Sequence, residues 1–155
     1  MNIHIDKANN DETSTVIELV KRLYIELGEE AESIVFLTDN LIRRIINSGK
    51  TEIYLAKREN HETVGIATLT ECQSIYAGGN YGLLDEMYVL PEFRSAGIGK
   101  YLVDKVISVA KEKKWKRIDV TTPSEQSWNR TIKFYKNRGF IYSGQKLKLP
   151  IQTST

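Results

Sequence analysis

The chain has 155 residues, the usual size of one domain, and we expect residues 1–155 to form a single domain. Lys and Arg total 22 and Asp and Glu total 20, so the formal net charge is +2. A balance so close to neutral argues against a dedicated nucleic-acid-binding or membrane-surface protein. The single cysteine, Cys72, excludes an internal disulfide and leaves too few soft ligands for a structural zinc site, so we expect no metal. The N-terminus shows no signal-peptide pattern and no apolar run is long enough to cross a bilayer, so we expect a cytoplasmic protein without membrane contact.

Hydrophobic periodicity predicts helices and strands in the first half of the chain. In chain order we expect a strand at 3–5, a helix at 16–27, a helix at 34–46, two hairpin strands at 53–57 and 64–70, and a loop at 75–81. The sequence Thr15-Val16-Ile17-Glu18 matches a capping box for the first helix, and Gly28 ends that helix. Gly49 ends the second helix in the same way.

The second half of the chain alternates strands with helices. In chain order we expect a strand at 83–89, a helix from 97 to 113, a strand at 118–121, a helix at 128–137, and one or two strands at 141–149. Pro91 closes the first of these strands, and Gly139 ends the last helix. Strands on either side of a long helix favour an α/β layered domain with at least one parallel crossover.

The turn between the strand at 83–89 and the following helix has the properties of an anion site. A helix N-terminus presents free N–H groups and the positive end of the helix dipole. Gly97 and Gly99 remove side chains that would keep a phosphate from the backbone, while Arg94 and Lys100 add positive charge. These residues predict a phosphate-bearing ligand at Arg94–Lys100.

Two nucleotide-binding motifs are excluded at this turn. A P-loop requires Gly and Ser or Thr where Arg94 and Tyr101 stand, and a dinucleotide fingerprint requires a third Gly where Leu102 stands. The remaining pattern, R-x-x-G-x-G after a strand, resembles the acetyl-coenzyme-A pyrophosphate loop of the GNAT superfamily of N-acetyltransferases. Met87-Tyr88-Val89 with Pro91 resembles the strand that leads into this loop, and the segment 134–140 resembles the family's F-Y-x-x-x-G-F pattern. The resemblance is specific over 83–140 and topological over 1–82.

The resemblance implies a fold and a cofactor site. The fold is an α/β domain with a central mixed, mostly antiparallel β-sheet flanked by α-helices, in which two parallel strands splay apart and form the acetyl-CoA cleft. The residues implied to bind the cofactor are Met87, Tyr88, Val89, Arg94, Ser95, Ala96, Gly97, Ile98, Gly99, Lys100 and Tyr135. The family often has Asn seven residues before the tyrosine; that position is Trp128 here, with Asn129 next to it. A cofactor contact by Asn129 therefore stays open.

The resemblance also implies catalytic roles. Tyr135 falls at the tyrosine that lies near the thioester sulfur, where a neutral phenol can protonate the departing thiolate. Glu86 is our candidate general base, acting through water, and Asp85 is its competitor. Strand alternation puts these two carboxylates on opposite faces, and a β-bulge, which the family commonly has here, would alter that assignment. The backbone N–H of Val89 is the expected oxyanion donor.

The implied function is acetyl-CoA-dependent N-acetylation of a primary amine, most plausibly on a small molecule, by direct attack in a ternary complex. A protein or peptide amine is the alternative acceptor, and a non-catalytic acyl-CoA-binding sensor is the alternative function. The basic run 111–117 is expected to be a solvated helix end and not a nucleic-acid site. An acidic cluster surrounds the junction of the first two helices, and we expect it to be a solvated acidic loop: Glu26, Glu29, Glu30 and Glu32. The family implies the alternative, in which this cluster borders the acceptor site and favours a cationic amine. The family implies a homodimer formed through the C-terminal strands; the sequence leaves open the acceptor and the choice between acetyl and longer acyl groups.

Overall fold

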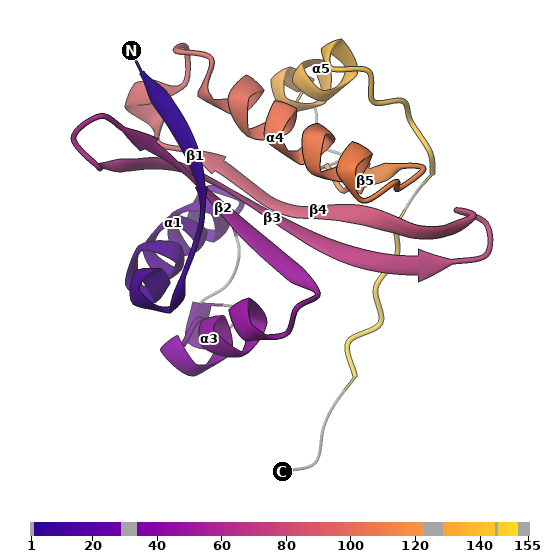
Figure 1. Ribbon diagram of the computed structural model, residues 1–155, viewed down its shortest axis with the longest axis horizontal. Coiled ribbons are helices and arrows are strands. Elements are labelled where there is room, and N and C mark those ends of the chain that lie inside the picture. The colour runs from indigo at the N-terminus through magenta and orange to yellow at the C-terminus, as the bar shows by residue number, and fades with distance from the viewer. Residues whose placement is uncertain (1, 29–33, 123–128, 145, 152–155) are drawn as a thin grey trace. The chain divides into compact units, whose positions relative to one another are not determined.

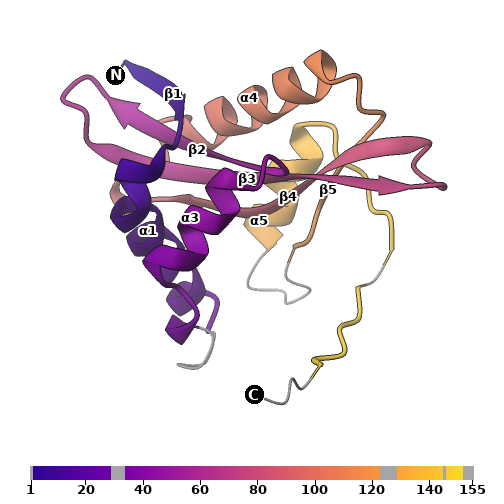
Figure 2. The same cartoon turned by 60° about the horizontal axis from the view of Figure 1, so that its bottom comes forward.

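The computed structural model describes residues 2–28, 34–122, 129–144 and 146–151. The chain forms two compact units, Met1–Val120 and Thr121–Thr155. In the first unit, helices α1 (Thr13–Glu26) and α3 (Asp39–Asn47) cover one face of a β-sheet, and α4 (Ile98–Glu112) covers the other (Figures 1 and 2). Within the described residues, no helix has the length and apolar character needed to cross a membrane.

The sheet has five strands in the order in which they occur along the chain. They are β1 (Ile3–Lys7), β2 (Thr51–Arg58), β3 (Thr63–Ser74), β4 (Gly79–Val89) and β5 (Ile118–Val120). The first four are antiparallel to their neighbours, whereas β4 and β5 run parallel and are joined through α4. The predicted mixed, mostly antiparallel sheet flanked by helices is therefore confirmed.

The core of the first unit lies on both sides of β3 and β4. Helix α4 buries Ile98, Leu102, Val103 and Val106 almost completely, and each such side chain stabilises the fold by about 1.5–3 kcal/mol. The helix approaches the sheet closely at Gly65, where an added Cβ would lie 3.2 Å from the Leu102 side chain. A glycine at this position of β3 thus lets α4 pack directly on the sheet.

The predicted start of the first helix is wrong, and the second predicted helix, 34–46, is interrupted at 36–38. Helix α1 begins at Thr13, and the capping box is formed by Asn9 and Glu12 around the short 3₁₀ helix η1 (Asn10–Glu12), not by residues 15–18. The hydroxyl of Thr13 donates to Asp39 at 2.5 Å, which ties α1 to α3. Helix α3 begins only at Asp39 because Thr38 is extended (φ −111°, ψ 158°) and its Oγ1 accepts the N–H of Leu41 as an N-cap. The helix ends at Gly28 and Gly49, both at positive φ, agree with the prediction.

Two expectations for loops and strands also need correction. Residues 79–81 belong to β4 and not to a loop, because they pair with the end of β3 in a hairpin that runs past the end of β2 (Figure 1). Residues 141–144 and 146–151 contain no strand, although one or two were predicted there. The side chains of Leu147 and Leu149 in this segment are more than 80 % exposed. An alternating pattern favours a strand only where a neighbouring strand pairs with it, and the described residues provide none here.

The second unit contains helix α5 (Asn129–Asn137). The predicted helix at 128–137 agrees with α5 from Asn129 onward, and Trp128 lies outside the described residues. Gly139 follows at positive φ (99°), as expected for a residue that ends a helix.

Candidate active site

Strand pairing between β4 and β5 covers only part of β4. The parallel pairing is confined to Gly82–Leu84 of β4, opposite Ile118–Val120. Beyond Leu84, β4 continues to Val89 with no strand partner on that side among the described residues. The backbone of Met87 and Val89 therefore lies on the part of β4 where the splay between the two parallel strands is predicted.

A β-bulge lies at the point where β4 passes beyond its pairing with β5. Ala67 pairs with Met87 and Leu69 pairs with Leu84, so Thr68 alone faces both Asp85 and Glu86. Because paired residues share a face, the bulge puts Leu84 and Met87 on the same face although they are three residues apart.

Glu86 consequently points to the face that α1 covers, together with Thr68. The hydroxyl of Thr68 accepts the N–H of Glu86 at 3.0 Å and donates to its carboxylate Oε1 at 3.1 Å. Thr68 is only 5 % exposed and Glu86 is half-buried, whereas Asp85 is exposed. Their burial thus distinguishes the two adjacent carboxylates, which strand alternation alone could not rank.

Burial raises the pKa of Glu86 to about 7, the charge of Asp85 acts in the same direction, and the hydrogen bond from Thr68 opposes both. A carboxyl group with this pKa exchanges a proton near neutral pH, as a general base must. Strongly perturbed acids of this kind concentrate at functional sites. Of the two adjacent carboxyl groups on this part of β4, Glu86 is therefore the one better suited to remove a proton.

The loop after β4 leads through the short 3₁₀ helix η2 (Pro91–Phe93) into α4. Gly97 is the N-cap of α4 and lies in the left-handed region (φ 80°, ψ 11°), where a side chain is strained. The first N–H groups of a helix have no intrahelical acceptor, which leaves those of Ile98, Gly99 and Lys100 directed out of the helix start. In contrast, the N–H groups of Arg94 and Ala96 donate to carbonyls within the loop, at 3.3 Å each. The anion-binding capacity of the loop is thus concentrated at the start of α4.

The Arg94 side chain makes contacts that the sequence did not indicate. Its Nε donates to the carbonyl of Val89 at 2.9 Å, and its Nη2 forms an ion pair with Glu26 at 2.9 Å. Its guanidinium also lies 5.2 Å from the centre of the Tyr88 ring. Arg94 therefore links the end of β4 to the last residue of α1, and Glu26 becomes part of the site.

Tyr135 belongs to α5 and thus to the second unit. It is buried, and its ring packs edge-on against Phe134 and Phe140 at 5.3 and 5.4 Å between centroids. Burial raises the pKa of Tyr135 to about 12, so the phenol keeps its proton at neutral pH. Asn129 is the first residue of α5, and its side chain lies outside the described structure, as do Glu29, Glu30 and Glu32.

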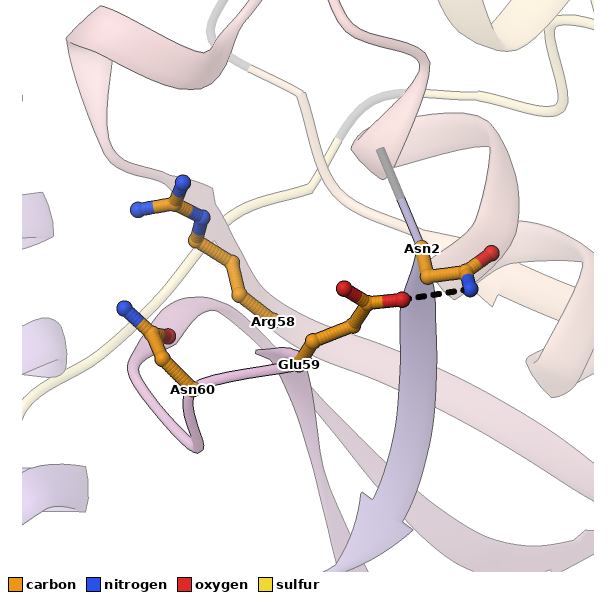
Figure 3. Close-up of a pocket in the computed structure, with 4 residues that line it drawn as sticks. All are labelled: Asn2, Arg58, Glu59 and Asn60. Carbon is orange, nitrogen blue, oxygen red and sulfur yellow. Dashed lines mark hydrogen bonds between the residues drawn. The ribbon is translucent and has the colours of Figure 1, made fainter.

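Two surface pockets are lined by residues outside the last part of β4 and the start of α4. One, of about 300 Å³, is lined by Asn2, Arg58, Glu59 and Asn60 at the start of β1 and the β2–β3 turn (Figure 3). The other, of about 490 Å³, lies at the tip of the β3–β4 hairpin. Within the described part of the chain, no group of three or more His, Cys, Asp or Glu side chains is arranged to hold a metal.

Two residues of the site were missed by the sequence prediction. Thr68 interrupts the apolar run of β3 as a buried polar residue, which is a usable signal because such a residue needs a hydrogen-bonding partner. Glu26 has no comparable signal, since an acidic residue at the end of a surface helix is common. Its pairing with Arg94 joins residues 68 positions apart.

The chain matches the model of the Acetyltransferase (GNAT) family over residues 15–140. It therefore belongs to this family, and the N-acetyltransferase class expected from the sequence is confirmed.

Similar proteins can be aligned with nearly the whole chain. An uncharacterized N-acetyltransferase from Archaeoglobus fulgidus is 26 % identical over 148 residues, covering 96 % of this chain and 95 % of the relative. The structure of an aminoglycoside acetyltransferase from an uncultured soil metagenomic sample, in complex with sisomicin, has a TM-score of 0.78 at 15 % identity, covering 98 % of this chain and 97 % of the other. A ribosomal-protein-alanine N-acetyltransferase from Brucella melitensis biovar Abortus 2308 also has a TM-score of 0.78, at 17 % identity, covering 97 % of this chain and all of the other. At these identities the two structures share the fold with this chain.

Proposed function

We propose that this protein transfers an acetyl group from acetyl-CoA to a primary amine by direct attack in a ternary complex, with Glu86 as the general base. The observation that carries the proposal is the position of the Glu86 carboxyl group, held by Thr68 in a bulge where β4 passes beyond its pairing with β5; burial there raises its pKa to about 7. The family supplies the chemistry of acetyl transfer, and Glu86 supplies the proton acceptor that this chemistry requires.

The residues present fit acetyl-CoA. The last residues of β4, from Met87 to Val89, lie beyond its strand pairing with β5, and an extended pantetheine arm would run beside them as a further strand would. The free N–H groups at Ile98, Gly99 and Lys100, together with the left-handed Gly97, suit a pyrophosphate. When bound, acetyl-CoA supplies a thioester whose carbonyl carbon accepts the amine and whose thiolate departs. The remaining cofactor contacts in the proposal are those of Tyr88, Arg94, Ser95, Ala96 and Tyr135.

Each proton and bond of the reaction has an assigned place. Glu86 receives a proton from the attacking amine, through a water molecule, as the carbon–nitrogen bond forms. The N–H of Val89 stabilises the oxyanion of the tetrahedral intermediate. Tyr135 donates its phenolic proton to sulfur as the carbon–sulfur bond breaks, and its raised pKa ensures that this proton is present at neutral pH.

The acceptor is proposed to be a small-molecule amine. Relatives of this fold include an aminoglycoside acetyltransferase and a ribosomal-protein-alanine N-acetyltransferase, so a protein or peptide amine is the second candidate. We further propose a single-domain, cytoplasmic enzyme that requires no metal and acts on neither nucleic acid nor membrane, and that forms a homodimer.

In the basic run 111–117, two cations have acidic partners, which supports the proposal that this run is not a nucleic-acid site. Lys113 pairs with Glu52 at 3.1 Å, and Arg117 pairs with Asp119 at 2.7 Å. A phosphate backbone is bound by clustered cations that are free to contact it.

The test is thiol release from acetyl-CoA with a panel of an aminoglycoside, a polyamine, an amino acid and a peptide with a free N-terminus. Amine-dependent release that Glu86→Gln lowers by about 10²-fold or more is expected. Glu59→Gln is the matched control, since Glu59 is an exposed acid on the β2–β3 turn that contacts Asn2. Binding of acetyl-CoA without release on any amine would instead favour a non-catalytic acyl-CoA sensor.

A further inference from the structure

We infer that Thr68 is a positioning residue that holds Glu86 in its productive orientation and sets the pH range over which it accepts a proton. This inference rests on the proposed function of Glu86 as the general base. The chemistry of acetyl transfer does not require a hydroxyl on β3, so the role of Thr68 is inferred from the geometry of this chain.

The geometry places one hydroxyl between two groups of the same residue. Thr68 Oγ1 accepts the backbone N–H of Glu86 at 3.0 Å and donates its proton to the carboxylate of Glu86 at 3.1 Å. The first bond replaces a ladder hydrogen bond at the bulge, where Glu86 has no directly opposed residue. The second fixes the side-chain rotamer of Glu86. A hydroxyl that accepts from the main chain has its own proton left for the carboxylate, so the two bonds are compatible and reinforce one another.

The surroundings of Glu86 make the Thr68 hydroxyl important for the stability of its ionised form. Thr68 is 5 % exposed, so water has little access to replace its hydrogen bonds. The adjacent charge, Asp85, repels a second negative charge, and burial acts in the same direction. On the face covered by α1, Tyr88 stands two residues along β4, and the charges of Arg94 and Glu26 are paired with each other. Thr68 therefore provides the hydrogen bond that favours the ionised form of Glu86 against two effects that disfavour it.

The experiment measures the titration of the Glu86 carboxyl carbon by NMR in protein labelled with ¹³C-glutamate, without substrate, with the resonance assigned from Glu86→Gln. Thr68→Val removes the hydroxyl at nearly constant volume, and we expect the pKa of Glu86 to rise. Thr68→Ser keeps the hydroxyl, and we expect it to restore the wild-type titration. Thr70→Val is the matched control, because Thr70 lies two residues along β3 and its hydroxyl contacts Thr51 instead. Its titration curve should match that of the wild type.

The same variants are then assayed for amine acetylation across pH. Without the hydrogen bond from Thr68, the pKa of Glu86 rises, and the fraction of Glu86 that is ionised near neutral pH falls by about tenfold. Thr68→Val should therefore lower kcat/KM near neutral pH by about tenfold. The loss should shrink toward higher pH, with KM for acetyl-CoA unchanged. A purely structural effect would lower the rate equally at every pH.

The outcomes separate this inference from the proposed function. An unchanged pKa of Glu86 in folded Thr68→Val would overturn the role of Thr68, whatever the activity. A raised pKa in a protein that acetylates no amine would support the role of Thr68 and contradict the proposed function. If Thr68→Val does not fold, the wild-type Thr68 methyl resonance decides the question. It should titrate with the midpoint of Glu86 and become independent of pH in Glu86→Gln, and a flat wild-type signal would overturn the inference.

Discussion

Replacing Glu86 with Gln should lower the rate of acetylation by about 10²-fold or more and at the same time stabilise the fold at alkaline pH. The pKa of Glu86 is about 7 in the folded protein and 4.5 is its ordinary value. Between pH 4.5 and about pH 7, Glu86 therefore keeps its proton in the folded protein and loses it in the unfolded chain. The contribution of Glu86 to stability is greatest below pH 4.5 and is lost as the pH rises through about 7. A difference of this size corresponds to about 3 kcal/mol in the free energy of unfolding above pH 7. Glutamine cannot ionise and avoids this loss.

The assay is urea unfolding of the wild type and Glu86→Gln near pH 5 and near pH 8, followed by circular dichroism. We expect the free energy of unfolding of Glu86→Gln, relative to that of the wild type, to be higher near pH 8 than near pH 5 by up to about 3 kcal/mol. The reason is that residue 86 ionises only in the wild type. The exposed control Glu59→Gln should show no such pH-dependent gain. Equal pH dependence of the wild type and Glu86→Gln would refute the argument that Glu86 is buried at a cost to stability.

Three further outcomes follow from the geometry. Asp85→Asn removes the neighbouring negative charge, so the pKa of Glu86 should fall and the pH–rate profile should shift to lower pH with activity retained; loss of activity at all pH values would instead make Asp85 the base. Tyr135→Phe should lower kcat by about 10²-fold with KM for acetyl-CoA unchanged, measured by thiol release, and an unchanged kcat would exclude the phenol as the acid. Gly82→Ala should destabilise the fold by about 1–3 kcal/mol in urea unfolding, because the new Cβ would lie 2.5 Å from the Trp115 ring; unchanged stability would show that Trp115 can move aside.

The parts of the site that could be predicted from the sequence are those formed by residues close together along the chain. The turn from β4 into α4 is local, so the glycines and the helix start at Gly97–Gly99 could be recognised from their spacing. The orientation of Glu86 could not, because it depends on the pairing of β4 with β3. Thr68 lies 18 residues from Glu86, and a single extra residue in one strand reverses which carboxylate is buried.

The same distinction explains the errors in the fold. The capping box predicted at 15–18 satisfied the local pattern, but Asn9 and Glu12 form another box just before it. The apolar alternation at 141–149 satisfied the local pattern of a strand, but a strand also needs a partner, which sequence periodicity cannot supply.

The most direct test of the account is calorimetric titration of the protein with acetyl-CoA. We expect a micromolar Kd, about −8 kcal/mol, for the wild type. Gly97→Asp should abolish binding, because it strains a left-handed residue and places a carboxylate at the anion site. Gly49→Asp is the control, since Gly49 has a similar φ (75°) and equally open surroundings at the end of α3. Wild-type affinity in Gly97→Asp, or no binding to the folded wild type, would contradict the proposed acetyl-CoA site.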